Sequence, residues 1–415
     1  MLFRSCGLHA PAHLAGRLPL STAYRLPSGL AARSAAILRD VRFLAFASQA
    51  VFVAAALAAG GWLVSNLLNA LEALGLNLSF GFLQRTAGFV IGQGPAMERT
   101  DTFLRAYTVG LANSLQVILV GLVLASLLGL LAGISLLSGN WLLRTVIRVY
   151  VEVMRNTPLL VQLFFLYFAV ILQLPSLENR VTLGPIILSQ RGMWLPRLVP
   201  SQGFGLWVGL AAVGALIGIV LYFRRADRRL RTGEETRPFV WGLGSLMIFG
   251  VAAWILAGGR PITVEYAQPE GLRMVGGTRL TPEFAGILFG LVLYTGAFIA
   301  DVVRAGLLAV APGQLEAARA IGLSELQVLR FVILPQALRV IVPPLTNQYL
   351  NLAKNSSLAI AVGFPDLYAV SKVIFSQSGQ AVQTIAMMMF TYLVISLLIS
   401  AIMNVINARL RIVER

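Results

Sequence analysis

The sequence predicts an all-α fold, a polytopic membrane helical bundle with about eight transmembrane helices. Of its 415 residues, 57% are hydrophobic and only 12% are charged, so the chain has too little polar surface to cover a soluble globule. Apolar stretches of about 20 residues, the length that crosses a bilayer as a helix, recur along the chain. Strand patterns that alternate over about ten residues are absent, and helices satisfy their own backbone hydrogen bonds in lipid.

Eight apolar stretches are expected to cross the membrane. They lie at roughly residues 43–64, 106–136, 146–172, 204–223, 239–258, 284–309, 336–361 and 382–408. Residues 1–40 contain no sustained apolar stretch, and we expect them to form a disordered or mis-started N-terminal tail. Residues 41–66 are expected to form an additional N-terminal transmembrane helix, with a cleaved signal peptide as the alternative. The apolar stretch continues beyond the small residues where a signal would be cut, which favours the helix.

The basic residues predict how the chain is oriented. Most of the 33 Lys and Arg lie in segments that would share one side, namely the two tails and the loops after the second, fourth and sixth stretches. Residues 224–237, RRADRRLRTGEETR, are the clearest of these loops. By the positive-inside rule, both termini and the loop at 312–335 are expected to be cytoplasmic. The net charge of +16 is dispersed over short loops, so nucleic-acid binding is not expected.

The residue inventory argues against an enzyme. Cys6, His9 and His13 are the only Cys and His residues, and all lie in the N-terminal tail, so we expect no catalytic residue and no metal site. A phosphate-binding P-loop needs Gly-Lys followed by Ser or Thr, whereas Lys354 and Lys372 follow Ala and Ser. We therefore expect no cofactor on this chain, and any energy from ATP must come from another protein.

Residues 312–335 form an amphipathic insert between two apolar stretches. Pro312 suits the first turn of a helix, and Gly322 can end that helix in a left-handed conformation. Ser324 and Gln327 have the spacing of a capping box, which predicts a second helix. We expect that helix to end at Leu334 and Pro335. The pattern predicts two short helices joined by a glycine elbow, although an ordinary amphipathic loop would have a similar composition.

Small side chains on the first helix of this elbow would let another protein approach closely. Ala317 and Ala318 follow Glu316, which would meet a polar or basic partner surface. The elbow is therefore a candidate docking site for a soluble protein.

The third stretch carries polar groups at its start. Glu152 and Arg155 lie one helical turn apart, and Pro158 would kink the helix and free carbonyls near Asn156 and Thr157. The alternative explains these residues equally well: Glu152 and Arg155 would extend their charged ends to the membrane–water interface, and Pro158 would make an ordinary kink.

In the sixth stretch, Asp301 and Arg304 are three residues apart. We expect them to form a local ion pair with a structural role.

The seventh stretch is the strongest candidate for a transport path. Pro343 and Pro344 are expected to break it, and beyond them lie the polar residues Asn347, Gln348, Asn351, Lys354, Asn355, Ser356 and Ser357. Four of these follow a spacing near four and would share one helix face. This face could bond to another helix, or it could line a path in which Lys354 meets a substrate carboxylate.

Three motifs resemble a known family. The residues EAARAIG, followed after nine residues by VILP, resemble the cytoplasmic loop of ABC importer membrane subunits. The residues RNTPLLVQLFF resemble the second core helix of polar amino-acid ABC permeases. These permeases carry a similar pattern upstream of the loop, here Asp301, Arg304, Gly306, Gly313 and Gln314. From about residue 107 onward, apart from residues 174–283, the chain resembles the general L-amino-acid permease type.

The resemblance implies an architecture. Residues 104–415 would be an ABC importer transmembrane domain with a five-helix core, made of the second, third, sixth, seventh and eighth stretches. An inserted helix pair would lie at about 204–258, and a cytoplasmic coupling loop at 312–335. The insertion and the additional N-terminal helix depart from the usual core, so contacts on the outer side cannot be transferred in detail.

The resemblance also implies a function. The chain would be the permease subunit of an ATP-driven importer that moves polar or general L-amino acids across the bacterial inner membrane by alternating access. Its partners would be an ATPase dimer that uses ATP with Mg, a second permease that is identical or paralogous, a periplasmic amino-acid-binding protein and the lipid bilayer. Coupling to the ATPase would involve Gly313, Gln314, Glu316, Ala317, Ala318, Gly322, Leu334 and Pro335. The substrate path would involve Asn347, Asn351, Lys354, Asn355, Ser356, Asn156 and Thr157.

Two other classes of membrane protein are alternatives to an ABC importer permease. An ion-coupled secondary amino-acid transporter would need structural repeats and a coupling carboxylate near the membrane midplane, and no convincing repeat is present. A membrane scaffold would explain the hydrophobicity but not the polar face of the seventh stretch.

Overall fold

The computed structural model describes residues 41–73, 79–233, 236–271 and 273–410, which belong to two compact units. In the first unit, Met1–Leu78, the described residues form the single helix α2 (Val41–Ala73), whose side chains are almost all exposed. Its segment Phe43–Ala70 is long and apolar enough to cross a membrane, in agreement with the predicted stretch at 43–64. The predicted disordered or mis-started tail, residues 1–40, lies outside the described residues.

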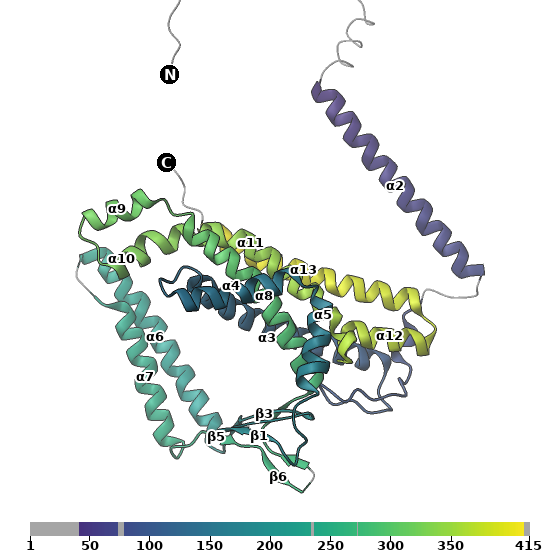
Figure 1. The fold of residues 1–415 in the computed structure, drawn as a ribbon, viewed down its shortest axis with the longest axis horizontal. Coiled ribbons are helices and arrows are strands. Elements are labelled where there is room, and N and C mark those ends of the chain that lie inside the picture. The colour runs from purple at the N-terminus through teal and green to yellow at the C-terminus, as the bar shows by residue number, and fades with distance from the viewer. Residues whose placement is uncertain (1–40, 74–78, 234–235, 272, 411–415) are drawn as a thin grey trace, which may run out of the picture. The chain divides into compact units, whose positions relative to one another are not determined.

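The second unit, Ser79–Arg415, is mainly helical (Figure 1). It begins with an extended segment that contains the short helix η1 (Gly81–Gln84). The helices that follow are α3 (Phe103–Ser135), α4 (Trp141–Asn156), α5 (Leu159–Phe164), η2 (Phe165–Ile171), α6 (Phe204–Thr232), α7 (Pro238–Leu256), α8 (Pro282–Leu308), α9 (Pro312–Ala320), α10 (Glu325–Val328), η3 (Leu329–Ile333), α11 (Leu334–Asn355), η4 (Ser356–Val362), α12 (Leu367–Ser378) and α13 (Ala381–Leu410).

The predicted fold class is confirmed. In the described part of the chain, seven helices are long and apolar enough to cross a membrane, and the bent pair of α4 with α5 and η2 would make an eighth.

The core is built on the close packing of α3 against α8. Both helices are rich in buried apolar residues, and glycines on α3 remove the side chains that would keep the two backbones apart. A Cβ added at Gly129 would lie 2.5 Å from Ile299 Cβ, and one at Gly133 would lie 2.7 Å from Val303 Cβ. These two glycines are one turn apart and therefore lie on the same face of α3.

Helices α6 and α7 form a hairpin. They pack chiefly on each other, and Ser245 Oγ on α7 donates a hydrogen bond to the Gly214 carbonyl on α6 at 2.8 Å. At the base of the hairpin, strand β4 (Arg197–Pro200) pairs with β5 (Ile262–Glu265), with Pro200 opposite Ile262. The hairpin thus leaves and re-enters the rest of the unit at neighbouring points.

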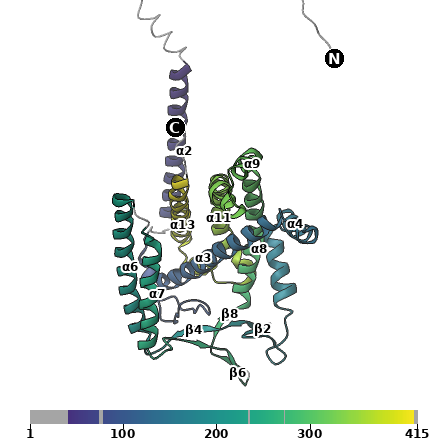
Figure 2. The ribbon, with the colours of Figure 1, turned by 90° about the vertical axis from the view of Figure 1, so that its left-hand side faces the viewer.

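Short strands occupy the segments before and after this hairpin. An antiparallel sheet has the order β1 (Val181–Leu183), β2 (Ile186–Ser189), β3 (Gly192–Leu195) and β8 (Thr278–Leu280). A second ribbon pairs β6 (Gln268–Glu270) with β7 (Arg273–Val275). The strands lie at one side of the unit and α9 lies at the other (Figures 1 and 2).

The third predicted stretch, residues 146–172, consists of two helices. α4 meets the segment Leu159–Ile171 at an angle of 112°. Pro158 lacks the amide hydrogen that would continue α4, so the sequence predicts a kink, but the observed change of direction is much larger. Gln162 Nε2 stabilises the break by donating to the carbonyl oxygens of Met154 and Thr157, at 2.7 and 2.9 Å.

The expectation that Pro343 and Pro344 break the seventh stretch is wrong. α11 continues through both prolines as an α-helix. The irregular segments lie at its two ends, where the π-helical η3 precedes it and the 3₁₀-helical η4 follows it. Packing against α8 and α13 on either side holds the helix together although two amide hydrogens are missing.

Candidate functional site

The glycine elbow between α9 and α10 is present as predicted. Gly322 has φ = +83°, a left-handed conformation that costs other residue types free energy. Its amide donates to the Arg319 carbonyl at 2.9 Å, and the amide of Leu323 donates to the Ala318 carbonyl at 3.2 Å. These two bonds are those of a Schellman motif, which satisfies the last carbonyls of α9.

The start of α10 and the angle of the elbow are fixed by side chains. Gln327 Oε1 accepts a hydrogen bond from the Ser324 backbone amide at 2.8 Å, as part of the predicted capping box. Arg319 on α9 donates to both carboxylate oxygens of Glu325 on α10, at 2.9 and 3.2 Å. The capping box thus fixes where α10 begins, and the ion pair of Arg319 with Glu325 links α9 to α10 across the elbow.

The helix that starts at α10 does not end at Leu334 and Pro335, so this expectation is wrong. α10, η3 and α11 form one continuous helical run from Glu325 to Asn355. The π-helical η3 ends at Ile333, two residues before Pro335, and its wider turn accommodates a residue without an amide hydrogen. The elbow is thus joined without interruption to the helix that carries the predicted substrate path.

Most of the predicted coupling residues lie on the surface. Gly313, Gln314, Glu316, Ala317, Gly322 and Leu334 are exposed, and Pro335 is half-buried. Ala318 is buried, so it packs inward and does not offer the expected contact to another protein. Apolar side chains that the sequence reading left out are strongly exposed here, namely Ile321 at 77%, Leu326 at 74% and Phe331 at 61%. Exposed apolar side chains that do not face lipid are typical of a surface that another protein covers.

The predicted path residues on α11 are only partly brought together. Asn347, Asn351 and Lys354 are exposed on α11, and Asn355 is half-buried at its end. Ser356 is fully buried in η4, where its hydroxyl donates to the Ala353 carbonyl at 2.8 Å. Its hydroxyl is therefore not part of the exposed face of α11. Asn156 and Thr157 lie at the break between α4 and α5, on a different part of the unit.

The predicted ion pair between Asp301 and Arg304 is wrong. Asp301 on α8 accepts a hydrogen bond from Arg155 on α4. Arg155 also lies over the ring of Phe298, at 5.5 Å from its centroid. The pair links two helices, so it fixes α4 to the helix that leads into the elbow.

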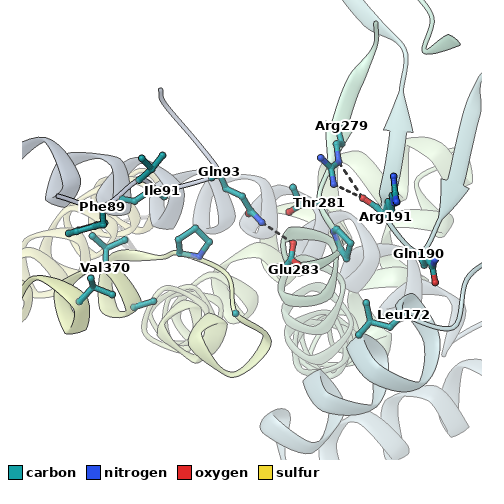
Figure 3. A pocket seen from close by; sticks show the side chains of 17 residues that line it. Phe89, Ile91, Gln93, Leu172, Gln190, Arg191, Arg279, Thr281, Glu283 and Val370 are labelled. Carbon is teal, nitrogen blue, oxygen red and sulfur yellow. Dashed lines mark hydrogen bonds between the residues drawn. The ribbon is translucent and has the colours of Figure 1, made fainter. Parts of the chain in front are cut away.

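A cavity lies near the strands, between segments that are far apart in the sequence (Figure 3). We call it the outer cavity because the strands lie at the side of the unit opposite α9 (Figures 1 and 2). Its volume is about 710 Å³, and its wall combines the extended segment at 89–93, the turn between β2 and β3, the start of α8 and the start of α12. The polar side chains in this wall are Gln93, Gln190, Arg191, Arg279, Thr281 and Glu283. Motif reading missed this cavity, because no local pattern marks residues that meet only in the fold.

A second cavity of about 570 Å³ shares part of this wall and extends to Asn113 and Gln116 on α3. Gln93 lines both cavities, and its Nε2 donates to Glu283 Oε2 at 2.9 Å. Asn113 is buried, and its Nδ2 donates to the backbone carbonyls of Gln93 at 3.2 Å and Pro365 at 2.8 Å. The extended segment is thereby held against α3 and the start of α12.

Among the described residues, no group of three or more His, Cys, Asp and Glu side chains could hold a metal ion.

Comparison with known proteins identifies the class. Residues 121–412 match the family described as the inner membrane component of binding-protein-dependent transport systems, and the chain belongs to this family. It is thus the permease component of an ABC importer and a multi-pass protein of the inner membrane.

Three relatives match most of the chain. YhdX of Escherichia coli strain K12, whose name assigns it provisionally to the amino-acid ABC transporter permeases, is 41% identical over 88% of this chain and 94% of its own. AapQ of Rhizobium johnstonii, a general L-amino acid transport system permease, is 41% identical over 81% of this chain and 84% of its own. BztB of Rhodobacter capsulatus, a glutamate/glutamine/aspartate/asparagine transport system permease, is 36% identical over 92% and 97%.

Among solved structures, an amino acid ABC transporter crystallised with histidines covers 74% of this chain and 95% of its own, at 21% identity and a TM-score of 0.43.

Proposed function

We propose that this chain is the permease subunit of an ATP-driven importer of amino acids, with a separate ATPase that docks on the elbow between α9 and α10. The names of AapQ and BztB support the substrate class, since both describe amino-acid transport. The observation that supports the coupling is the elbow at Gly322 together with the exposed apolar side chains Ile321, Leu326 and Phe331 on it and on the helix that follows.

The elbow would pass a movement of α9 and α10 on to α11. Gly322 and the ion pair of Arg319 with Glu325 set the angle between α9 and α10. From Glu325 the helix continues to Asn355 without a break. A push on α9 and α10 by an ATPase would therefore move α11 as a rigid lever, which provides the change of access that an importer needs.

The polar face of α11 is the proposed substrate path. Asn347, Asn351 and Lys354 are exposed on this helix, and exposed amides and a cation are costly against lipid. A second permease subunit, identical or paralogous, would cover this face and close the path. Lys354 would then meet the carboxylate of the amino acid, and the Asn side chains would bond to its polar groups.

The remaining parts of the assembly follow from the same proposal. Both termini and the elbow would face the cytoplasm, as the distribution of basic residues predicts. A periplasmic binding protein would deliver the amino acid to the side that carries the strands. ATP with Mg would bind to the partner ATPase and not to this chain.

Replacement of Gly322 by Val tests the proposal. A β-branched residue at φ = +83° is strained by about 1–2 kcal/mol or more, so the elbow would change its angle. We expect the variant to insert normally, while ATP-driven uptake in proteoliposomes with the partner subunits falls by at least about tenfold. The readout is radiolabelled amino-acid uptake at equal abundance of the permease.

Gly139→Val is the matched control, because Gly139 lies in the loop between α3 and α4 without a positive φ and with open space around it. We expect its uptake to match that of the wild type. Normal uptake by the Gly322 variant, or amino-acid uptake by the purified chain without any ATPase, would contradict the proposed function.

A further inference from the structure

The outer cavity carries both signs of charge in one wall. Glu283, at the start of α8, is half-buried, while Arg279 on β8 and Arg191 in the turn between β2 and β3 are exposed (Figure 3). We propose that this cavity is a reception site that binds the charged backbone of an amino acid, its carboxylate at Arg279 and its ammonium group at Glu283. The inference rests on the proposed function and concerns a site separate from the polar face of α11.

Arg279 is positioned to receive a carboxylate. Its Nε and Nη2 donate to the Arg191 carbonyl at 3.3 and 2.8 Å, and its guanidinium lies 5.6 Å from the ring centroid of Trp194. These contacts hold the planar guanidinium in one orientation, and its Nη1 group can still donate to a ligand. A held guanidinium binds a carboxylate with little loss of side-chain entropy.

Glu283 is positioned to receive an ammonium group. Its Oε2 accepts from Gln93 Nε2 at 2.9 Å, and its Oε1 lies 3.4 Å from the hydroxyl of Tyr167. The carboxylate lies in the first turn of α8, where the helix dipole favours a negative charge. An ammonium group is a stronger partner than the neutral amide of Gln93, so it would replace that amide at Glu283.

The exchange at Glu283 would also open the way inward. Gln93 lines both the outer and the second cavity, and its side chain bonds to Glu283 between them. Its backbone is held separately, by Asn113 on α3. Release of the Gln93 side chain therefore requires no movement of the backbone, and it gives the amino acid access to the second cavity beside Gln116 on α3.

The test uses the complete importer in proteoliposomes, with L-glutamine as the probe, since only its backbone groups are charged. For Glu283→Gln and Arg279→Gln we expect the KM of uptake to rise about tenfold each, the loss expected for one charge-assisted contact, with kcat changed less than about twofold. Gln93→Ala should lower KM, because it removes the amide that competes with the ammonium group. Arg197→Gln on β4 is the control, because Arg197 is exposed and lines neither cavity.

A purely structural role for these residues would give a different pattern. It would make Gln93→Ala as harmful as Glu283→Gln, and it would leave the discrimination against glutaramate, which is glutamine without the ammonium group, unchanged. We expect Glu283→Gln to reduce that discrimination. An unaltered KM in both charge variants, or a rise in KM for Gln93→Ala, would overturn the proposal.

Binding measured without nucleotide separates this inference from the proposed function. Isothermal titration with L-glutamine of the importer purified without its periplasmic binding protein should show binding that the combined variant Glu283→Gln with Arg279→Gln loses. If the wild type binds L-glutamine in this way but shows no ATP-driven uptake, the proposed function fails and the reception site stands. If uptake is normal and the combined variant binds L-glutamine like the wild type, the reception site fails alone.

Discussion

The buried carboxyl group of Asp366 makes the stability of the folded protein depend on pH. Its carboxylate caps α12 by accepting from the amides of Ala369 at 2.8 Å and Tyr368 at 3.2 Å, and it also accepts from the hydroxyl of Tyr392 at 3.3 Å. Burial raises the pKa of Asp366 from 3.8 to about 6, although the three donors favour the charged form. The folded protein thus binds this proton more tightly than the unfolded chain. The resulting stabilisation is complete below about pH 4 and is lost as the pH rises through about 6.

We predict that Asp366→Asn stabilises the protein at neutral pH. Asn is a good N-cap that keeps the acceptor for Ala369, and it removes the cost of a buried charge. The gain at pH 7.5 should reach at most about 3 kcal/mol, since one pKa unit corresponds to about 1.4 kcal/mol. The measurement is thermal unfolding in detergent, with the melting temperature of the variant compared with that of the wild type between pH 4.5 and 7.5.

The difference in melting temperature should grow as the pH rises through this range. A difference that is the same at every pH would show that the charge of Asp366 is not the cause.

At single residues, the sequence predicted what depends on local geometry. The left-handed Gly322 and the capping box at Ser324 were recognisable because turn chemistry acts over a few residues. The partner of Asp301 was not recognisable. A local pair with Arg304 would contribute only a few tenths of a kcal/mol, so the packing of α4 on α8 decides which arginine binds the carboxylate.

Between elements, the contact of α3 with α8 is one of the close helix contacts that depend on glycine. Gly129 and Gly133 lie against Ile299 and Val303, with no room for a methyl group at either glycine. Without a hydrophobic driving force between helices in lipid, such close van der Waals contact is a main source of helix association.

Gly133→Ala is predicted to destabilise the protein by about 1–3 kcal/mol, because the added Cβ would overlap Val303 and the Ala300 carbonyl. The melting temperature of the protein in detergent should fall. Gly209→Ala on α6 is the matched control, since open space surrounds that glycine, and it should leave this temperature unchanged. Equal melting temperatures for Gly133→Ala and Gly209→Ala would argue against a tight contact at Gly133.

For whole helices, the predictions made from the prolines were wrong. Pro335, Pro343 and Pro344 each suggested an end or a break, yet the helical run from Glu325 to Asn355 includes all three. A proline costs a helix about 3 kcal/mol in isolation, but packing on α8 and α13 and the π-helical turn at η3 offset that cost. Such compensation depends on neighbours that a linear sequence does not reveal.

For the whole molecule, the hairpin of α6 and α7 is organised as an insertion. Its helices pack chiefly on each other, and β4 and β5 bring its two ends together. We predict that removal of residues 201–261, with Pro200 joined to Ile262 through Asn-Gly, leaves the importer assembled and active. Asn-Gly favours the two-residue turn that links antiparallel strands.

Co-purification with the partner subunits and amino-acid uptake within about twofold of the wild type are the expected results, because the energy of folding in the core does not depend on the hairpin. Loss of a partner subunit from the purified complex would instead show that the hairpin forms an interface.

The overall plan of the molecule was predictable, but the outer cavity was not. Hydropathy and the motif around Glu316 predicted a membrane bundle with an inserted helix pair, since both signals are carried by continuous segments. The outer cavity is assembled from Gln93, Arg191, Arg279 and Glu283, which are separated by up to 190 residues and meet through short strands of three or four residues. Strands that short leave almost no periodic signal.

The bend at Pro158 has a consequence for the surrounding lipid. Beyond it, α5 and η2 comprise six and seven residues, which span only about 20 Å at 1.5 Å per residue. This is less than the hydrocarbon thickness of a typical bilayer, about 30 Å. Crossing the bilayer with this segment alone would require the phospholipids beside it to thin or tilt, and a thicker membrane would raise that cost.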